Sequence, residues 1–499
     1  GAWPAAQNSP RSTAEIYNVP RNKGRRRDLS VVNPVAQFFL CKLISENWNA
    51  IRSHIKSNSL SLDDINISKD DVRAVPSPDF ASISQKQSEI SSLYNYALST
   101  DISRFYSTLY THAIPWALHG KVWCKENLTD NIYKSSLGAR LDAAVRKGND
   151  NQTIGIPVGP DTSRIISEIV AVSIDRIIIE KLALNQENAV RNVDDLFVGF
   201  DTLARAEDAA AISAIACREF QLESHPDKTA AKEMPWFNEP PWPLVLSQIT
   251  FSKSQKKQLS DIRHFFTLAL DFQKKHPDDN VLNYAVKVTS SSDILSENWS
   301  EYETFLLRVG RSNHTTIPSV VKIFTNYNLL GAPLNKPKIS KFIKDLIVQC
   351  SPLARHSEVA WALFLAKALK VKVEANWLEY VVKMDSSVCA LIALDLRSRG
   401  LILGNIDTSL WESALTTEGL NSSMWLLAYE AKLKGWLNSA TPDYVDNHPH
   451  FKVLLDKKIS FYNPKKNVQK ISPSKKKIQT PSFAPGFMYN VFNASGFTF

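Results

Sequence analysis

Three carboxylates have the residue type and spacing that a cation-dependent reaction requires. Asp194 and Asp195 are adjacent in RNVDDLFVGF, residues 191–200, where short apolar runs flank them. This pattern predicts a tight β-hairpin that buries its strands and presents its acids at the turn. Adjacent carboxylates repel one another, so a buried pair requires a compensating cation, most simply Mg²⁺. A solvated Asp-Asp turn is the alternative for the dipeptide taken by itself.

A third carboxylate, Asp101, precedes this hairpin in the chain. The segment Tyr96–Leu98 is typical of a strand that delivers Asp101 at its end. Phe105, Tyr106 and Leu109 follow at the spacing of one helical face. A second acid site of this kind favours cation binding over a solvated turn.

A loop rich in glycine and proline lies between the two acid sites. The run TIGIPVGPDTSRIISEIVA, residues 153–171, continues into a predicted helix over Arg164–Lys181. Gly159 allows the backbone to approach a base or sugar closely, where any Cβ would collide. The chain contains no GxxxxGK[ST] motif, so a phosphate-binding loop of the NTPase type is excluded.

Taken in order, the strand-end acid, the Gly-Pro loop with its helix and the acid hairpin resemble the palm of a reverse transcriptase. The most specific resemblance is to the bacterial abortive-infection (Abi) reverse transcriptases, the group that includes AbiK, over residues 70–230. It is carried by the strings DISRFY, YTH, PWALHGK and GIPVGPDTSRI. The resemblance implies an α+β fold, in which reverse-transcriptase fingers and palm precede an all-α, HEAT-like helical repeat domain.

The resemblance also implies two-metal nucleotidyl transfer from dNTPs. Asp101 and Asp194 would bridge both Mg²⁺ ions, for which Mn²⁺ is expected to substitute, and Asp195 would be the weaker, outer ligand. Lys228, in the string FQLESHPDKTAA, would protonate or neutralise the leaving pyrophosphate. The alternative for Lys228 is a solvated loop lysine.

Further contacts to the nucleotide follow from the same resemblance. The segment VRAVPSPDFASISQKQSEI resembles the R-x-I-x-x-P…Q string that is common in bacterial reverse transcriptases. By this resemblance Arg73 would bind the triphosphate, and Gln87 occupies the position of the glutamine at the end of the string. Tyr106, five residues after the strand-end acid, takes the place of an aromatic steric gate that leaves no room for a 2′-hydroxyl. Gly159 and Pro160 would contact the substrate from the loop.

One position departs from the family pattern. Most reverse transcriptases carry an aromatic residue two positions before the first hairpin acid, and this chain has Asn192. The change alters the surface that meets a primer end and disfavours ordinary primer extension. The resemblance instead implies template-independent, protein-primed synthesis of single-stranded DNA that stays attached to the protein, in phage defence by abortive infection. An RNA-templated enzyme of the retron type and a catalytically silent nucleic-acid-binding scaffold are the alternatives.

A priming hydroxyl must reach the acids, so it is expected on an exposed segment. Tyr17 in the polar N-terminal arm is the first candidate and Tyr489 near the other end is the second. Tyr94 and Tyr96 are poorer candidates because they lead directly into the strand that ends at the acid. A plain surface aromatic is the alternative for Tyr17.

The chain divides into four segments by composition. A polar arm over 1–27 ends in RNKGRRRD, and fingers and palm occupy 28–245, where a proline-rich break follows. A helical repeat domain is predicted over 246–462, and a basic, flexible tail over 463–499. The arginines of the arm are either solvated or contact phosphates or a neighbouring subunit. The lysines and aromatic residues of the tail are either solvated or hold single-stranded DNA.

Three similar segments support the prediction of helical repeats. They begin at Ser357, Ser386 and Ser422, and each serine is expected to N-cap a helix. Arrays of this kind bind nucleic acid or protein along a concave face.

Composition bounds the remaining possibilities. The net charge of +9 and the pI near 9.1 favour a polyanionic partner. Five scattered cysteines without CxxC spacing indicate a reducing compartment and no zinc site. No apolar run reaches the roughly 18 residues of a membrane span, and no secretion signal is visible. We therefore expect a cytoplasmic bacterial protein, a homo-oligomer, with no membrane partner.

Overall fold

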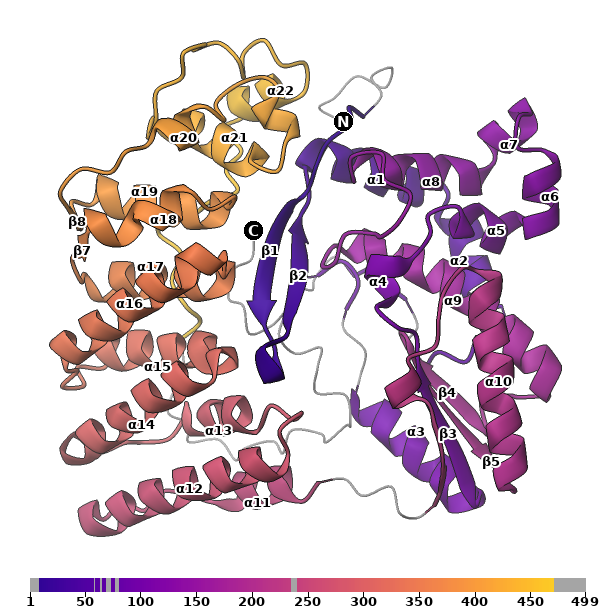
Figure 1. Cartoon of the computed structure of the whole chain (residues 1–499), viewed down its shortest axis with the longest axis horizontal. Coiled ribbons are helices and arrows are strands. Elements are labelled where there is room, and N and C mark those ends of the chain that lie inside the picture. Colours follow the sequence, from indigo (N-terminus) through magenta and orange to yellow (C-terminus); the bar gives the residue numbers. More distant parts are fainter. Residues whose placement is uncertain are drawn as a thin grey trace.

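A four-stranded antiparallel sheet and a stack of helices lie in the two lobes of the chain (Figure 1). The computed structural model describes residues 9–57, 59–62, 65–68, 73–76, 80–234 and 240–470. The architecture is mixed but mostly helical, which is consistent with the predicted α+β class. An N-terminal hairpin lies between the two lobes.

The sheet provides the frame for the acids. Its strands are β3 (Tyr96–Asp101), β4 (Ala189–Asn192), β5 (Asp195–Phe200) and β6 (Ala230–Glu233), in the order β4-β5-β3-β6. The helices over its two faces are α3 (Phe80–Leu93), α9 (Asp161–Leu182) and α10 (Leu203–Glu219). Successive side chains of a strand point to opposite faces. Leu98 and Val198 therefore share a core with α9 and α10, whereas Ala97 and Phe197 share a core with α3.

Shorter helices complete the sheet lobe. They are α1 (Pro34–Glu46), α2 (Trp48–Lys56), α4 (Phe105–Thr108), α5 (Ala113–His119), α6 (Lys121–Glu126), α7 (Asn131–Ser135) and α8 (Leu137–Lys147). Helix α9 runs through the centre of this lobe and is buried along almost its whole length. Its many β-branched residues are weak helix formers, so packing rather than propensity stabilises it.

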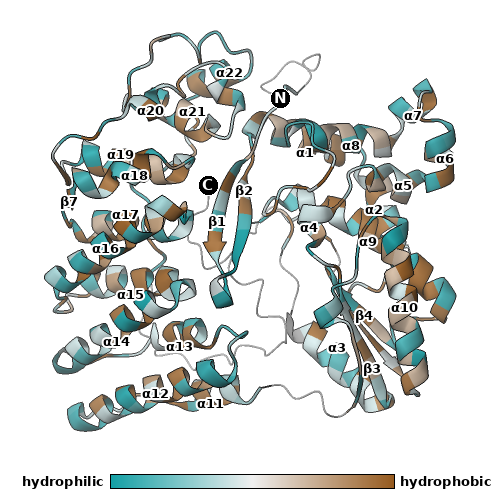
Figure 2. Cartoon of the chain, in the orientation of Figure 1, coloured by the Kyte–Doolittle hydropathy of each residue, from teal (hydrophilic) through white to brown (hydrophobic). Residues whose placement is uncertain are grey.

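The N-terminal segment is not a free arm. Strands β1 (Glu15–Pro20) and β2 (Arg26–Val31) pair as an antiparallel hairpin. The alternation of β1 buries Tyr17 and Val19 in the core of the helical lobe and leaves Ile16 exposed. The prediction of a solvated arm over 1–27 is therefore wrong for this hairpin, because β1 packs on helix α17 (His356–Leu369). The turn of the hairpin is hydrophilic (Figure 2).

The second lobe is a stack of helices that runs along one side of the molecule (Figure 1). Its helices besides α17 are α11 (Trp242–Gln248), α12 (Gln255–Lys275), α13 (Val281–Thr289), α14 (Trp299–Ser312), α15 (Ile317–Leu329), α16 (Lys336–Cys350), α18 (Glu379–Val382), α19 (Ser387–Ser398), α20 (Ser409–Glu412), α21 (Trp425–Lys434) and α22 (Phe451–Asp456). A two-stranded parallel ladder joins β7 (Val373–Glu374) to β8 (Ile402–Leu403). Neighbouring helices of the stack pack on one another, as α12 does on α13, α16 on α17 and α17 on α19, and one continuous apolar core runs through the lobe.

Only one of the predicted serine caps is present. Ser386 caps α19, and its side chain accepts a hydrogen bond from the Cys389 amide. Helices α17 and α21 instead begin after Arg355 and Met424, so the expected caps at Ser357 and Ser422 are wrong. The apolar runs predicted the positions of these helices correctly. The serines near the start of two of the runs did not predict the residue at which the helix begins.

The boundaries of the helical lobe differ from those in the sequence interpretation. Helix α11 begins at Trp242, which packs in the core of the helical lobe, so this lobe starts before residue 246. At the other end, Val468 is buried in the core of the helical lobe, so the packing extends beyond residue 462. Residues 471–499, and Tyr489 with them, lie outside the described residues. In the described ranges, no helix combines the length and apolarity that a membrane span requires.

Candidate active site

The register of the sheet brings the predicted acids together at one end. Asp101 is the last residue of β3 and lies directly opposite Asp195, the first residue of β5. Asn192 pairs with Asp195, so Val193 and Asp194 form the two-residue turn between β4 and β5. Val193 has a φ of 57°, a left-handed conformation that is unusual for a β-branched residue. The predicted strand and hairpin are thus both present.

A cleft of about 570 Å³ opens in front of this turn. Asp101 and Asp194 line the cleft and Asp195 does not. Eight cationic side chains line it as well: Arg21, Arg25, Arg26, Arg27, Arg73, Arg104, Arg164 and Lys228. A basic cleft with two acids at one wall suits a polyanionic substrate that reacts at a bound cation.

The carboxylates destabilise one another's charge. Asp101 and Asp194 lie within hydrogen-bonding reach of each other. Burial, reinforced by the charges of Asp195 and Asp101, raises the pKa of Asp194 well above its usual range. Desolvation and the charge of Asp101 raise the pKa of Asp195 to about 6, although Lys228 opposes the shift. Such a group is stable in its charged form only beside a cation.

Lys228 is the cation that the chain itself supplies. It ends a short helical turn, Pro226–Lys228, and its Nζ donates to Asp101 Oδ2. Burial alone would lower the pKa of Lys228, but the hydrogen bond to Asp101 and the three carboxylate charges raise it. Lys228 therefore contacts a predicted acid, and its role toward a leaving pyrophosphate stays a prediction.

The donor chemistry fits a magnesium-type cation. Within the part of the chain that the structure describes, Asp101 Oδ1 is buried and has no hydrogen-bond partner. Carboxylate oxygens are the ligands that Mg²⁺ prefers in proteins. The ligand atoms of the three acids do not all lie within 4.8 Å of one another here. Asp101 and Asp194 are the pair that would hold the cation, with Asp195 at the periphery.

A second cluster has potential ligand atoms within 4.8 Å of one another, namely His314, Cys350 and Glu358. Both oxygens of Glu358 already accept from Arg26, at 2.8 Å and 2.7 Å. Burial and the charge of Glu358 raise the pKa of the Cys350 thiol to about 11. A neutral thiol beside a guanidinium–carboxylate pair is a poor metal site, so this cluster is a structural ion pair.

The Gly-Pro loop borders the same cleft as the acids. Gly155 has a φ of 86° and Gly159 a φ of 126°, conformations that other residues rarely adopt. Pro160 then occupies the N-cap position of α9, without a side-chain capping hydrogen bond. The loop is tied to the hairpin, because the Ser30 amide donates to the Val158 carbonyl at 2.9 Å. Gly159 and Pro160 line the cleft, as their predicted role requires.

Tyr106 also lines the cleft, from helix α4. Its backbone carbonyl accepts from the Ile156 amide at 2.8 Å, and its hydroxyl lies 3.1 Å from Ser167 Oγ on α9. Burial raises the pKa of this hydroxyl, which therefore stays neutral. Tyr106 is thus held between the loop and α9.

The two fingers residues differ in outcome. Arg73 lines the cleft, and its guanidinium binds Asp161, the first residue of α9, as well as the Gly159 carbonyl at 3.1 Å. A triphosphate would meet this guanidinium beside the loop. Gln87 lies on α3 and is not among the residues that line the cleft. The structure therefore does not bring Gln87 to the acids.

Tyr17 does not have the exposure on which its candidacy as primer rests. Its side chain is 3% exposed, and its ring stacks on His356 with centroids 6.2 Å apart. Burial raises the pKa of its hydroxyl well above the usual value. Its neighbour Ile16, on the opposite face of β1, lines the cleft instead. Successive side chains of a strand point to opposite faces, which separates Ile16 from Tyr17. Strand β1 was not predicted from the sequence.

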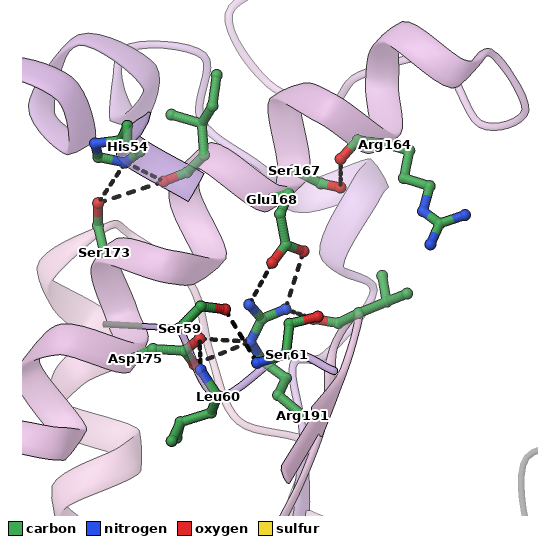
Figure 3. A network of polar contacts seen from close by, with 12 residues as sticks. His54, Ser59, Leu60, Ser61, Arg164, Ser167, Glu168, Ser173, Asp175 and Arg191 are labelled. Atoms are coloured by element: carbon green, nitrogen blue, oxygen red, sulfur yellow. Dashed lines mark hydrogen bonds and ion pairs between the residues drawn. The ribbon is translucent and has the colours of Figure 1, made fainter. Parts of the chain in front are cut away.

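Sequence reasoning missed a buried arginine beneath the turn. Arg191 is 3% exposed and lies between Glu168 and Asp175 of α9 (Figure 3). A signal was present, because Glu168 and Asp175 are seven residues apart and so share a helix face. A charged residue inside an apolar strand was the second half of that signal.

Comparisons with known proteins leave the family of this chain open. No family model and no curated protein matches it. Among solved structures, it is similar to telomerase from Candida albicans in complex with a fragment of telomeric RNA, with a TM-score of 0.28 and 13% identity over 66% of this chain and 62% of that chain. Telomerase from Candida tropicalis in the same kind of complex gives 0.31 and 12%, over 78% and 65%. The chain thus spans under two thirds of each telomerase chain, and similarity at this level assigns no chemistry.

Proposed function

We propose that this chain is a nucleotidyltransferase, a reverse-transcriptase-like DNA polymerase that joins dNTPs to a hydroxyl group. One observation carries the proposal: the carboxylate at the end of β3, Asp101, and the carboxylate in the β4–β5 turn, Asp194, meet at the wall of a basic cleft. The Gly-Pro loop and Tyr106 border the same cleft. Acids, loop and aromatic ring are the parts that nucleotide addition needs within reach of one another.

Each residue has a task in this proposal. Mg²⁺, when bound by Asp101 and Asp194, would lower the pKa of the attacking hydroxyl and neutralise the triphosphate. Arg73 would bind the triphosphate where Asp161 and the loop orient its guanidinium. Tyr106 would pack beneath the sugar, and Lys228 would provide positive charge or a proton for the leaving pyrophosphate.

The finer assignment is an enzyme of the Abi type, which makes single-stranded DNA without a template, from a protein hydroxyl, in phage defence. It is supported by the sequence strings and by Asn192, which is 8% exposed and takes the place of the usual aromatic residue. Tyr17 could serve as the primer only if β1 left the helical lobe. Tyr489 is the second candidate.

An RNA-templated enzyme of the retron type is the competing function. The basic cleft favours it as much as the Abi type, because an RNA template is also a polyanion. A silent scaffold is disfavoured, because a scaffold need not keep three mutually repelling acids.

The test is to incubate the purified chain with Mg²⁺ and one labelled dNTP at a time, with and without RNA, and then denature it. We expect incorporation without RNA, label that migrates with the protein, and no incorporation by Asp101→Asn or Asp194→Asn. The amide keeps the shape of the carboxylate and loses the charge that holds the cation. Near-normal incorporation by either variant would contradict the polymerase, whereas a strict requirement for RNA would favour the retron type.

A further inference from the structure

We infer that Arg191 is the positioning residue for Asp194, acting through the backbone of the turn. The inference rests on the proposed function, because it concerns the same acids. Arg191 lies in β4, and its guanidinium extends toward Glu168 and Asp175 of α9 (Figure 3). Arg191 is not among the residues that line the cleft, so it would act on the reaction through the turn.

All three nitrogens of the guanidinium donate hydrogen bonds, to carboxylates of α9 and to the carbonyl of the turn. Its Nη2 donates to Glu168 Oε1 at 2.6 Å and its Nε donates to Asp175 Oδ1 at 2.9 Å. Its Nη1 donates to the Val193 carbonyl at 2.8 Å. The planar fork of arginine permits these contacts at the same time, and the point charge of a lysine does not.

The contact to Val193 matters because that residue is in a conformation it would not choose alone. A valine at a φ of 57° is strained, and strained residues persist only where surrounding contacts hold them. On the other side of the acid, the Asp194 carbonyl accepts from the Ile102 amide at 3.2 Å. Both peptide groups that flank Asp194 are therefore fixed, one by Arg191 and one by the strand that carries Asp101.

We call the contacts of Arg191 with Glu168, Asp175 and Val193 the clamp. Helix α9 connects the clamp to the side of the cleft that the Gly-Pro loop forms. Asp161 at its start binds Arg73, and Ser167 in its second turn contacts the Tyr106 hydroxyl. Glu168 and Asp175 follow on the same helix and hold Arg191. The helix therefore sets the distance between the loop that would hold a nucleotide and the turn that carries Asp194. Small misplacements of such groups have large effects on rate.

The experiment replaces the planar guanidinium of Arg191 by the ammonium group of lysine, which keeps the positive charge. Arg191→Lys should weaken Mn²⁺ binding, measured by electron paramagnetic resonance without nucleotide, by roughly 10-fold to 100-fold. kcat should fall in parallel, and KM for dNTP should change little, because the loop and Arg73 are untouched. Glu168→Gln, which removes one arm of the clamp, should show a smaller loss of the same kind.

Arg176→Lys is the matched control. Arg176 is on the same helix, and its guanidinium contacts the His54 carbonyl and Ser57 instead of the turn. Mn²⁺ affinity and kcat should stay at the wild-type level in this variant.

Circular dichroism establishes that each variant is folded, and Glu168→Gln decides the matter if Arg191→Lys does not fold. Wild-type Mn²⁺ affinity and kcat in the folded clamp variants would overturn the positioning role and leave the proposed function intact. Mn²⁺ binding that Asp194→Asn leaves unchanged would overturn the proposed function, and the positioning role with it.

Discussion

The cleft brings together single residues to which the proposed function assigns the binding of one cation and one nucleotide. Asp101 has one oxygen on Lys228 and the other buried without a partner among the described residues. A buried carboxylate oxygen without a partner costs folding energy, so its retention indicates a use that the folded chain alone does not provide. Tyr106 is the residue at this scale whose role can be separated from metal binding.

Tyr106→Val should admit ribonucleotides. Removing the ring opens space for a 2′-hydroxyl beneath the sugar, and we expect discrimination between dNTP and rNTP to fall by roughly 10-fold or more. Competition between the two nucleotides in one reaction measures this ratio. Tyr106→Phe keeps the ring and loses only the contact to Ser167, so it should discriminate as the wild type does. Unchanged selectivity between dNTP and rNTP in the valine variant would mean that Tyr106 is not the steric gate.

At this scale the sequence predicted the residues whose chemistry is local. Asp101 and Asp194 were found because a strand end and a tight turn leave patterns a few residues long. The occlusion of Tyr17 and the distance of Gln87 from the cleft were not predictable in this way. They depend on which distant elements pack against β1 and α3, and a single sequence does not contain that information.

At the scale of elements, the N-terminal hairpin is the component that joins the lobes. Strand β2 binds the Gly-Pro loop through Ser30, and β1 packs on α17. Arg26 is the main anchor on the helical side, because it forms a two-pronged ion pair with the buried Glu358. This pairing and a bond from His314 hold the pKa of Glu358 at about 2, against the opposing effect of burial.

Arg26→Met should destabilise the docking of the hairpin. Loss of the guanidinium leaves the Glu358 carboxylate, 1% exposed, without its main partner, at a cost of roughly 3 kcal/mol. Hydrogen exchange over residues 15–31 and the denaturation midpoint measure the effect. Lys23→Met is the control, since its pair with Asp278 is exposed and is worth no more than about 1 kcal/mol. Equal effects of the two substitutions would argue against an anchoring role for Arg26.

The titration of Glu15 should make the stability of the docked hairpin depend on pH. Burial raises the pKa of Glu15 to about 8, although bonds from Ser386 and the Val388 amide oppose the shift. The folded state therefore holds a proton that the unfolded state releases near the usual value of 4.5. Stability from this group is full below pH 4.5 and is lost as pH rises through 8.

Glu15→Gln should accordingly stabilise the protein more at high pH than at low pH. The amide cannot ionise, so the gain should be near zero at pH 4.5 and on the order of 1 kcal/mol or more at pH 8.5. Thermal denaturation of both proteins across this range measures it. A gain that is the same at both ends would mean that Glu15 does not titrate in the docked hairpin.

The elements themselves were predictable to different degrees. Helix α9 and the β4–β5 hairpin follow from apolar periodicity and lie close to their expected ranges. The β1–β2 hairpin was missed because its strands are short and polar, and because its apolar partners belong to helices more than three hundred residues away. Contacts of that separation leave no local pattern.

At the scale of the whole molecule, the hairpin places the arginines of the N-terminal segment over the cleft. Arg21, Arg25 and Arg27 line the same cavity as Asp101 and Asp194. Arg21 and Arg25 also border a second cavity of about 460 Å³, which reaches Arg355 at the start of α17. The two cavities share these residues, so positive charge continues from the acids to the helical lobe. Under the proposed function, we expect a single-stranded nucleic acid to follow this route.

Salt dependence tests whether a strand passes the hairpin. Binding of single-stranded DNA releases counterions, and the slope of log K against log salt changes by about 0.7 for each phosphate contact. Arg25→Gln combined with Arg27→Gln should therefore flatten the slope by about 1.4 and weaken binding of short oligo(dT), followed by fluorescence anisotropy. Arg52→Gln, on an exposed part of α2 outside the cleft, should leave the slope unchanged. An unchanged slope in the hairpin variant would mean that bound DNA avoids these arginines, and the charge between the lobes would then serve the triphosphate alone.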